Sequence, residues 1–125
     1  MKKVLFVFLF CLATVAFAQS SNPCGVAPTP GAPHVCLSWT ASTTPGVTYN
    51  VYRATTANGE NYATPLNAAP ISAIFFYDAT AAVGTQYFYK ITAVIGGSMS
   101  APSSEVSVQV PTPPAAPTNP VAAVN

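Results

Sequence analysis

The chain has 125 residues, of which half are hydrophobic and only 6% are charged. So few lysines and arginines leave no basic patch of the kind that binds nucleic acid through several phosphates, and no polybasic stretch for an anionic membrane. Low charge favours disorder only when hydrophobicity is also low, so this composition predicts one folded domain with a core of its own.

Residues 1–18 are predicted to be a signal peptide. Lys2 and Lys3 precede an apolar stretch over residues 4–17, and residues 16–18 read Ala-Phe-Ala, an A-x-A cleavage pattern. The apolar stretch is short for a membrane span. Two alternatives stay open: a retained anchor, and lipidation of Cys11, whose neighbours are bulkier than lipoprotein processing prefers. Cleavage implies a secreted or extracellular protein, in the periplasm or on the cell surface in some hosts, with no membrane contact afterwards.

Cys24 and Cys36 are predicted to form a structural disulfide. The segment between them is rich in Pro and Gly and is expected to turn near Pro30. The two cysteines would then face each other on antiparallel strands, at a Cα separation of about 4.5 to 5.5 Å that a disulfide can span. An exported chain meets the oxidising conditions that such a bond needs. A redox-active or metal-binding pair is the alternative, but it calls for C-x-x-C spacing or further ligands.

Apolar residues alternate with a period of two between Val35 and Val110, which is typical of half-buried strands. Five strands are predicted, over residues 34–39 (Val35, Leu37 and Trp39 inward), 47–53 (Val47, Tyr49 and Val51 inward), 71–77, 85–95 (Tyr87, Tyr89, Ile91, Ala93 and Ile95 inward) and 105–110 (Val106, Val108 and Val110 inward). Residues 54–70 are predicted to be a loop that can hold a short edge strand around Tyr62. Asp78 is expected to end the strand before it by accepting hydrogen bonds from nearby backbone amides.

No apolar stripe of helical spacing follows the first 18 residues, so helix is not expected. Several short strands separated by turn residues predict an all-β sandwich, with one face of each strand in the core.

Several segments together resemble a fibronectin type III domain: LSW at 37–39, YNVYR at 49–53, Tyr77-Asp78, GTQYFYKITAV at 84–94, and Ser100 followed by SSEVSVQVP. The resemblance implies an immunoglobulin-like β-sandwich of about seven antiparallel strands over residues 19–110, with the strongest match over 35–110. It also implies that Trp39 lies in the core and that Tyr87 makes a corner hydrogen bond. Such a bond is needed because a buried phenol must find a partner, which a turning backbone supplies.

Residues 111–125 are predicted to be a Pro-rich linker or tail. Its segment AAPTNPVAAVN resembles the opening strand of a further fibronectin type III repeat. Either the chain is a fragment of a longer multidomain protein, or this segment is a linker-like end.

The side chains suited to catalysis are few and scattered, so an enzyme is not expected, and neither is a cofactor or a metal. His34 is predicted to face solvent at the start of a strand, and Asp78 is assigned to its turn, which leaves no Ser-His-Asp unit. Glu60 and Glu105 are expected to be solvated ends rather than paired catalytic acids.

Aromatic residues on the outward strand faces are the candidate binding surface. Strand alternation turns Tyr52, Phe75 and Phe88 away from the core, with Tyr62 in or near a loop. Such rings can stack on sugars or anchor a protein, although neighbouring side chains often cover them. The sequence thus predicts an exported non-catalytic spacer, adhesion or protein-interaction module, with a protein or glycan of the cell surface or matrix as partner. A carbohydrate-binding module is the alternative.

Overall fold

The computed structural model describes residues 24–25 and 32–124, and within them the chain is all-β. Six strands are present: β1 (Val35–Ser38), β2 (Thr48–Ala54), β3 (Phe75–Asp78), β4 (Gln86–Ile95), β5 (Ser98–Met99) and β6 (Val106–Gln109). The expectation of an all-β chain is therefore confirmed for this part. The predicted signal peptide, Cys11 and the turn at Pro30 lie outside the described residues.

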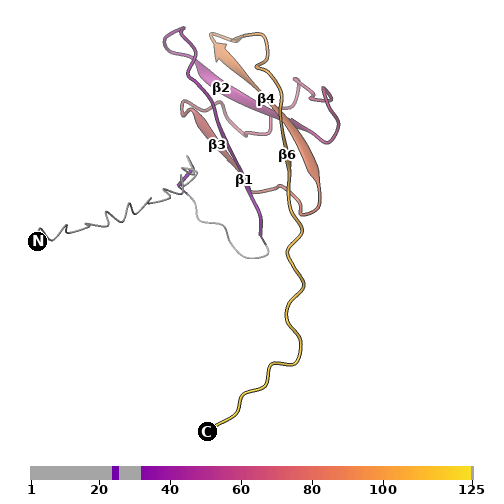
Figure 1. Cartoon of the computed structure of the whole chain (residues 1–125). Helices are drawn as coiled ribbons and strands as arrows, with labels where there is room; N and C mark the ends of the chain where they lie inside the picture. Colours follow the sequence, from indigo (N-terminus) through magenta and orange to yellow (C-terminus); the bar gives the residue numbers. More distant parts are fainter. Residues whose placement is uncertain (1–23, 26–31, 125) are drawn as a thin grey trace, which may run out of the picture.

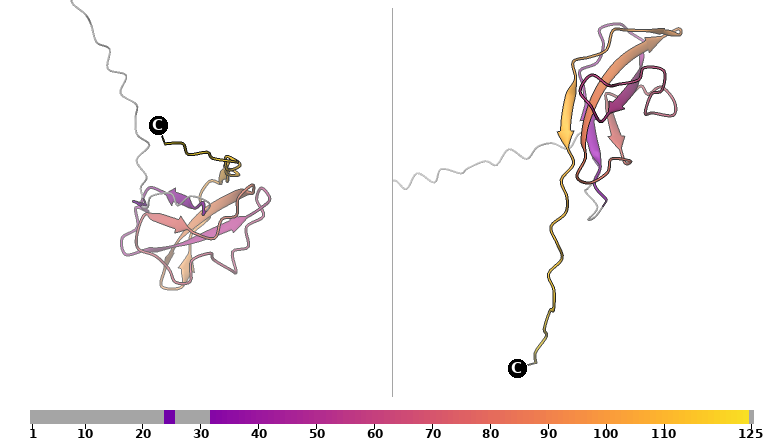
Figure 2. Two further views of the ribbon diagram at one scale, coloured as in Figure 1. Left: turned by 90° about the horizontal axis from the view of Figure 1, so that it is seen from below. Right: turned by 90° about the vertical axis from the view of Figure 1, so that its right-hand side faces the viewer.

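The strands form two antiparallel sheets. β1 pairs with β3 in the smaller sheet, while β4 is the centre of the larger one, with β2 along one edge and both β5 and β6 along the other. Figure 1 shows this arrangement, and the view from below in Figure 2 shows β1 and β3 as one layer lying over β2 and β4. This architecture is that of a β-sandwich, as the alternating pattern predicted.

One hydrophobic core lies between the two sheets. Its buried members come from both layers and from the end of the last strand: Val35, Leu37, Val51, Ala81, Tyr87, Tyr89 and Val110. Val51 and Tyr89 are fully buried. Burial of a large side chain of this kind contributes about 1.5 to 3 kcal/mol relative to exposure, so the inward positions of β2 and β4 stabilise the fold most.

A tight hairpin joins β4 to β5. Its loop is Gly96-Gly97, both with positive φ (54° and 80°), and it pairs Ile95 with Ser98. A two-residue loop with positive φ at both positions is the type I′ turn, whose twist matches that of the strands. The predicted end of the long strand at these glycines is confirmed.

The final strand is broken into β5 and β6 by Pro102 and its neighbours. Across the break, the hydroxyls of Ser100 and Ser103 accept hydrogen bonds from the amides of Ala93 and Ile91 in β4, at 2.9 and 3.0 Å. Serine side chains thereby satisfy amides of β4 where the regular ladder is interrupted.

The predicted strand over residues 71–77 is shorter than expected. Ile71 instead pairs with Tyr49 as an isolated bridge on the free edge of β2, and strand structure resumes at Phe75. Asn67 completes this edge: it is buried, and its carboxamide oxygen accepts a hydrogen bond from Val51 at 2.7 Å. Residues 67–71 therefore provide hydrogen-bond partners for backbone groups on the free edge of β2.

The inward positions of the last strand are only partly buried. Val110 is buried, as expected, but Val106 is 48% exposed, so its predicted core position is wrong. Ile95 is also 48% exposed. Val106 lies on the edge strand β6, beside the buried Tyr89 of β4, and Ile95 lies at the hairpin end of β4, so alternation alone does not bury either side chain.

Trp39 and Tyr87 occupy the boundary of the core. Trp39 follows β1, is half-buried, packs against the core and meets the ring of Tyr49 edge-on at 5.4 Å. The hydroxyl of Tyr87 accepts a hydrogen bond from the amide of Ala82, five residues earlier, at 3.1 Å. The expected contact between a buried phenol and a turning backbone is therefore present.

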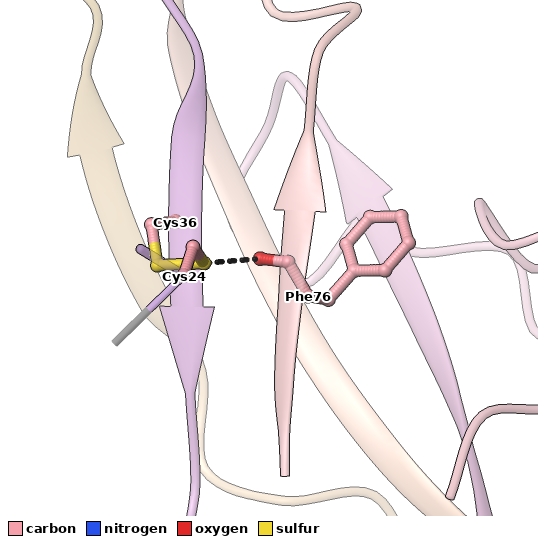
Figure 3. Close-up of a disulfide and its surroundings, with 3 residues drawn as sticks. All are labelled: Cys24, Cys36 and Phe76. Carbon is pink, nitrogen blue, oxygen red and sulfur yellow. Dashed lines mark hydrogen bonds between the residues drawn. A yellow bond between two sulfur atoms is a disulfide. The ribbon is translucent and has the colours of Figure 1, made fainter. Parts of the chain in front are cut away.

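The disulfide between Cys24 and Cys36 is present, with a Cα–Cα separation of 5.9 Å. Figure 3 shows it lying against β1, with Cys24 Sγ directed at the carbonyl oxygen of Phe76 in β3, 3.4 Å away. Because a disulfide sulfur carries no proton, this is a sulfur–carbonyl contact. Cys36 pairs with Tyr77 in the β1–β3 ladder, whereas Cys24 lies outside any strand, so the expected opposition of two strands at the cysteines is not what joins them.

Residues 111–124 contain no strand, and all of them are exposed. Figure 1 shows this segment running away from the sandwich beyond β6. An exposed, Pro-rich segment of this kind is suited to act as a spacer.

Replacing both cysteines, as Cys24→Ser with Cys36→Ser, should lower the free energy of unfolding by about 3 kcal/mol, because the link closes a short loop in the unfolded chain. Urea denaturation followed by tryptophan fluorescence measures this. The wild-type protein treated with reductant is the control and should show the same loss. Two free thiols in non-reduced, freshly exported protein would contradict the prediction.

Candidate functional site

The first polar site joins the two sheets and is called the inter-sheet cluster: Arg53, Asp78, Thr80 and Tyr89. Arg53 lies opposite Tyr89 in the β2–β4 ladder, and Asp78 ends β3 in the other sheet. Asp78 Oδ2 accepts hydrogen bonds from Arg53 Nη1 at 2.7 Å and from the Tyr89 hydroxyl at 2.8 Å. Its Oδ1 accepts from the Thr80 amide and hydroxyl at 2.9 and 2.7 Å.

Asp78 is therefore both a turn residue and a buried anion. The bond from the Thr80 amide confirms its expected part in the turn, but the side chain is also only 1% exposed, against 23% for Arg53. The Arg53 guanidinium in addition lies over the ring of Tyr87, 4.6 Å from its centroid. A buried carboxylate requires such partners, because an unpaired one would cost several kcal/mol.

The hydrogen bonds of the inter-sheet cluster shift the pKa values of Asp78, Arg53 and Tyr89. The shifts keep Asp78 and Arg53 charged and Tyr89 protonated. Burial raises the pKa of Asp78, but hydrogen bonds from Thr80, Tyr89 and Arg53 outweigh it and hold the pKa below its ordinary value. Burial lowers the pKa of Arg53, but the hydrogen bond to Asp78 and the charge of Asp78 outweigh burial, so the pKa lies above its ordinary value. Burial and then the bond to Asp78 raise the pKa of Tyr89 well above its usual range. The cluster is built to stay ionised and bound, which favours a structural part for Asp78.

The second polar site lies on the outer face of the larger sheet and is called the outer-face cluster: Asn58, Glu60, Lys90 and Glu105. Lys90 Nζ donates to Asn58 Oδ1 at 2.7 Å and lies 3.5 Å from Glu60 Oε2 and 3.8 Å from Glu105 Oε2. Glu105 also accepts a hydrogen bond from the Asn58 amide at 2.6 Å. Asn58 has φ 54°, a left-handed conformation that Asn tolerates, and this bend turns the loop back toward Lys90.

Glu60 is the unusual member of this cluster. The expectation of a solvated residue is wrong, since Glu60 is 8% exposed and neither carboxylate oxygen receives a hydrogen bond. Its charge is balanced by Lys90 at ion-pair distance. Burial lowers the pKa of Lys90, but the charges of Glu60, Tyr62 and Glu105 raise it by more.

The candidate binding aromatics are less exposed than predicted. Tyr52 does face outward from β2, opposite Lys90, but it is only 1% exposed because the following loop covers it. Its ring meets that of Tyr62 edge-on at 5.0 Å. Tyr62 and Phe88 are half-buried, and Phe88 lies diagonally from Tyr52 on the same face, opposite Ala54. The prediction of Tyr52 as an exposed ring is wrong, and the three rings form no open patch.

Phe75 is the more accessible ring. It begins β3 and is 43% exposed, with Ile74 beside it at 47%. On the same face of the smaller sheet, the ring of Tyr77 contacts that of His34 in a tilted arrangement, with the centroids 4.4 Å apart. His34 is half-buried and its Nδ1 has no hydrogen-bond partner, so it is less solvent-facing than expected.

A shallow apolar groove of about 330 Å³ runs between β1 and β6. Its walls are Pro33, His34, Val35, Cys36, Val108, Gln109, Val110 and Pro111. Neither polar cluster opens into it, so no titratable pair is positioned to act on a molecule held there.

The described residues contain neither a membrane-spanning helix nor a metal-ligand cluster. No helix there is long and apolar enough to cross a membrane. Over the same ranges, no three or more His, Cys, Asp or Glu side chains gather closely enough to hold a metal ion.

In comparisons with known proteins, no family model matches the chain, and no curated protein matches it significantly. The two clusters and the aromatic surface are thus the features from which function has to be argued.

Arg53 and Lys90 are the site residues that the strand pattern could have identified. Inward alternation from Tyr49 and Val51 continues to Arg53, and a cation on a core face requires an anion as partner. Lys90 alternates outward, next to the covered Tyr52. Their partners Asp78 and Asn58 are 25 and 32 residues away in sequence, and strand alternation alone does not place those segments.

Asp78→Asn should lower the free energy of unfolding by about 2 kcal/mol, because charge-assisted bonds are lost and Arg53 is left without its anion. Chemical denaturation at neutral pH measures this. Glu105→Gln removes a more exposed acid and should cost under about 1 kcal/mol. Equal losses in the two variants would contradict a central role for Asp78.

Stability should also fall in acid through Asp78. Because its pKa in the folded state lies below the ordinary 3.8, the unfolded chain binds the proton more readily. The contribution is therefore complete above that ordinary value and is lost as pH falls through the folded-state pKa. Thermal unfolding of wild type and Asp78→Asn between neutral pH and strong acid tests this, and the two curves should converge at the acid end. A constant gap between them would count against it.

Proposed function

We propose that the chain is an exported, non-catalytic module of fibronectin type III type that acts as an extracellular spacer, adhesion or protein-interaction domain. Most residues of the sequence segments that resemble that family lie on the strands of a two-sheet antiparallel sandwich. Tyr87 makes the backbone contact that the resemblance implies, and the disulfide is compatible with an extracellular location.

The proposal rests on one observation: the carboxylates of Asp78 and Glu60 are occupied by contacts within the protein. Asp78 binds four donors, and Glu60 is buried against Lys90. A general acid or base must reach a substrate, and both of these carboxylates face protein partners instead. Their arrangement supports a scaffold rather than an active site.

Phe75 supports the choice of a protein partner. Together with Ile74 it offers exposed apolar area next to the end of the loop before β3. Aromatic residues of this kind are enriched among the residues that dominate protein interfaces. The glycan alternative needs a flat, open aromatic platform, and Tyr52, its first candidate, is covered.

Screening on a glycan array and a panel of cell-surface and matrix proteins tests the proposal. We expect no glycan binding, and a protein interaction that Phe75→Ser weakens by about tenfold or more. Phe88→Ser, on the opposite face, is the matched control and should leave that interaction unchanged. Glycan binding that Phe88→Ala abolishes would favour the carbohydrate-binding module. Hydrolytic activity that Asp78→Asn or Glu105→Gln removes would overturn the non-catalytic assignment.

A further inference from the structure

The outer-face cluster combines an amine, a carboxamide and a buried acid in one place. Lys90 Nζ lies 2.7 Å from Asn58 Oδ1, which is bonded to the carbon Cγ that an amine attacks. Glu60 Oε2 lies 3.5 Å from the same nitrogen. An ordinary surface ion pair needs no carboxamide and no buried acid, and it contributes little to stability.

We propose that Lys90 and Asn58 become joined by an intramolecular isopeptide bond, formed between Lys90 Nζ and Asn58 Cγ, with Glu60 transferring the protons. The bond ties the centre of β4 to the loop after β2. It is a covalent modification of the chain by itself and requires no other reactant.

The reaction balances in protons and charge. Glu60 takes a proton from the Lys90 ammonium, and the free amine attacks Asn58 Cγ to form the new C–N bond. Glu60 returns the proton to Asn58 Nδ2, the Cγ–Nδ2 bond breaks, and the nitrogen leaves with a second proton from Nζ as ammonium. The protein loses one positive charge, and Glu60 ends as it began.

The surroundings of Glu60 suit this proton transfer. Its oxygens receive no hydrogen bond and its side chain is only 1% exposed, so the carboxylate beside the amine is shielded from water and has Lys90 as its neighbouring proton donor. The charge of Glu60 is itself a main cause of the raised pKa of Lys90, so transfer of the proton to Glu60 is uphill, and attack of the free amine on Asn58 is the step that draws it forward. Transfer between the two leaves a neutral pair, which burial favours.

The loop holds the carboxamide in place for attack. Glu105 accepts a hydrogen bond from the Asn58 amide, and the Asn58 carboxamide oxygen accepts one from Lys90 Nζ. Effective molarities for well-oriented groups within one molecule reach about 10⁵ M or more. Asn58 is exposed, so the ammonium that forms can leave to solvent.

Tryptic digestion with mass spectrometry tests the bond. Lys90 is the one tryptic site within residues 54–125, and a Lys acylated at Nζ is not cleaved. We expect a single fragment 54–125, lighter than its sequence by one ammonia, with fragmentation placing the link between Asn58 and Lys90. Separate fragments 54–90 and 91–125 of unchanged mass would overturn the proposal.

Three variants should lose the link completely while staying folded by circular dichroism. Lys90→Arg keeps the charge without the nucleophile, Glu60→Gln removes the proton carrier, and Asn58→Gly accepts the positive φ without the carboxamide. The link blocks tryptic cleavage after Lys90, so the Glu60→Gln and Asn58→Gly variants should again be cleaved there.

Glu105→Gln compares the two acids: the Gln carboxamide oxygen can still accept the hydrogen bond from the Asn58 amide, so the loop keeps its place while the second acid near Lys90 is removed, and the link should persist. A link that survives Glu60→Gln but not Glu105→Gln would overturn the part assigned to Glu60. Conversion of Asn58 to Asp at the Asn-Gly step, with Lys90 still cleaved, would show hydrolysis of the carboxamide and overturn the isopeptide assignment.

Discussion

The buried carboxylate of Asp78 is the constraint on which the rest of the sandwich depends. It ends a strand of the smaller sheet, yet its partners Arg53 and Tyr89 belong to the larger one. A buried anion tolerates few geometries, so these bonds fix how the two sheets are set against each other more narrowly than apolar packing does. The apolar core supplies most of the stability, and the inter-sheet cluster fixes the position of one sheet relative to the other.

The same arrangement explains why the aromatic run from Tyr87 to Tyr89 is used as it is. Tyr87 receives the Ala82 amide at the corner and carries the Arg53 guanidinium over its ring, and Tyr89 donates to Asp78. Each inward tyrosine combines a large apolar ring with one satisfied polar group. Phe88, between them, faces the other way and has no polar atom to satisfy.

Sequence alone predicts the features that depend on neighbours in the chain. The alternation around Val51 and Tyr89, the turn at Asp78 and the hairpin glycines all follow from local rules, and the structure has them. Local rules do not predict which outward or inward side chains are buried by segments distant in the sequence. Tyr52 and Glu60 are buried because the loop after β2 folds over the outer face, and Val106 is exposed on the edge strand β6 although its partner Tyr89 in β4 is fully buried.

The two polar clusters differ in what their burial achieves. In the inter-sheet cluster, four donors satisfy the carboxylate, so its charge is stable and its chemistry is quenched. In the outer-face cluster, the Glu60 oxygens receive no hydrogen bond, and their nearest cation also touches a carboxamide. Glu60 is therefore the acid that lies beside both an amine and a carboxamide, the position that a proton carrier between them requires. A disulfide beside β1 and a covalent tie on β4 would then brace both sheets of the sandwich.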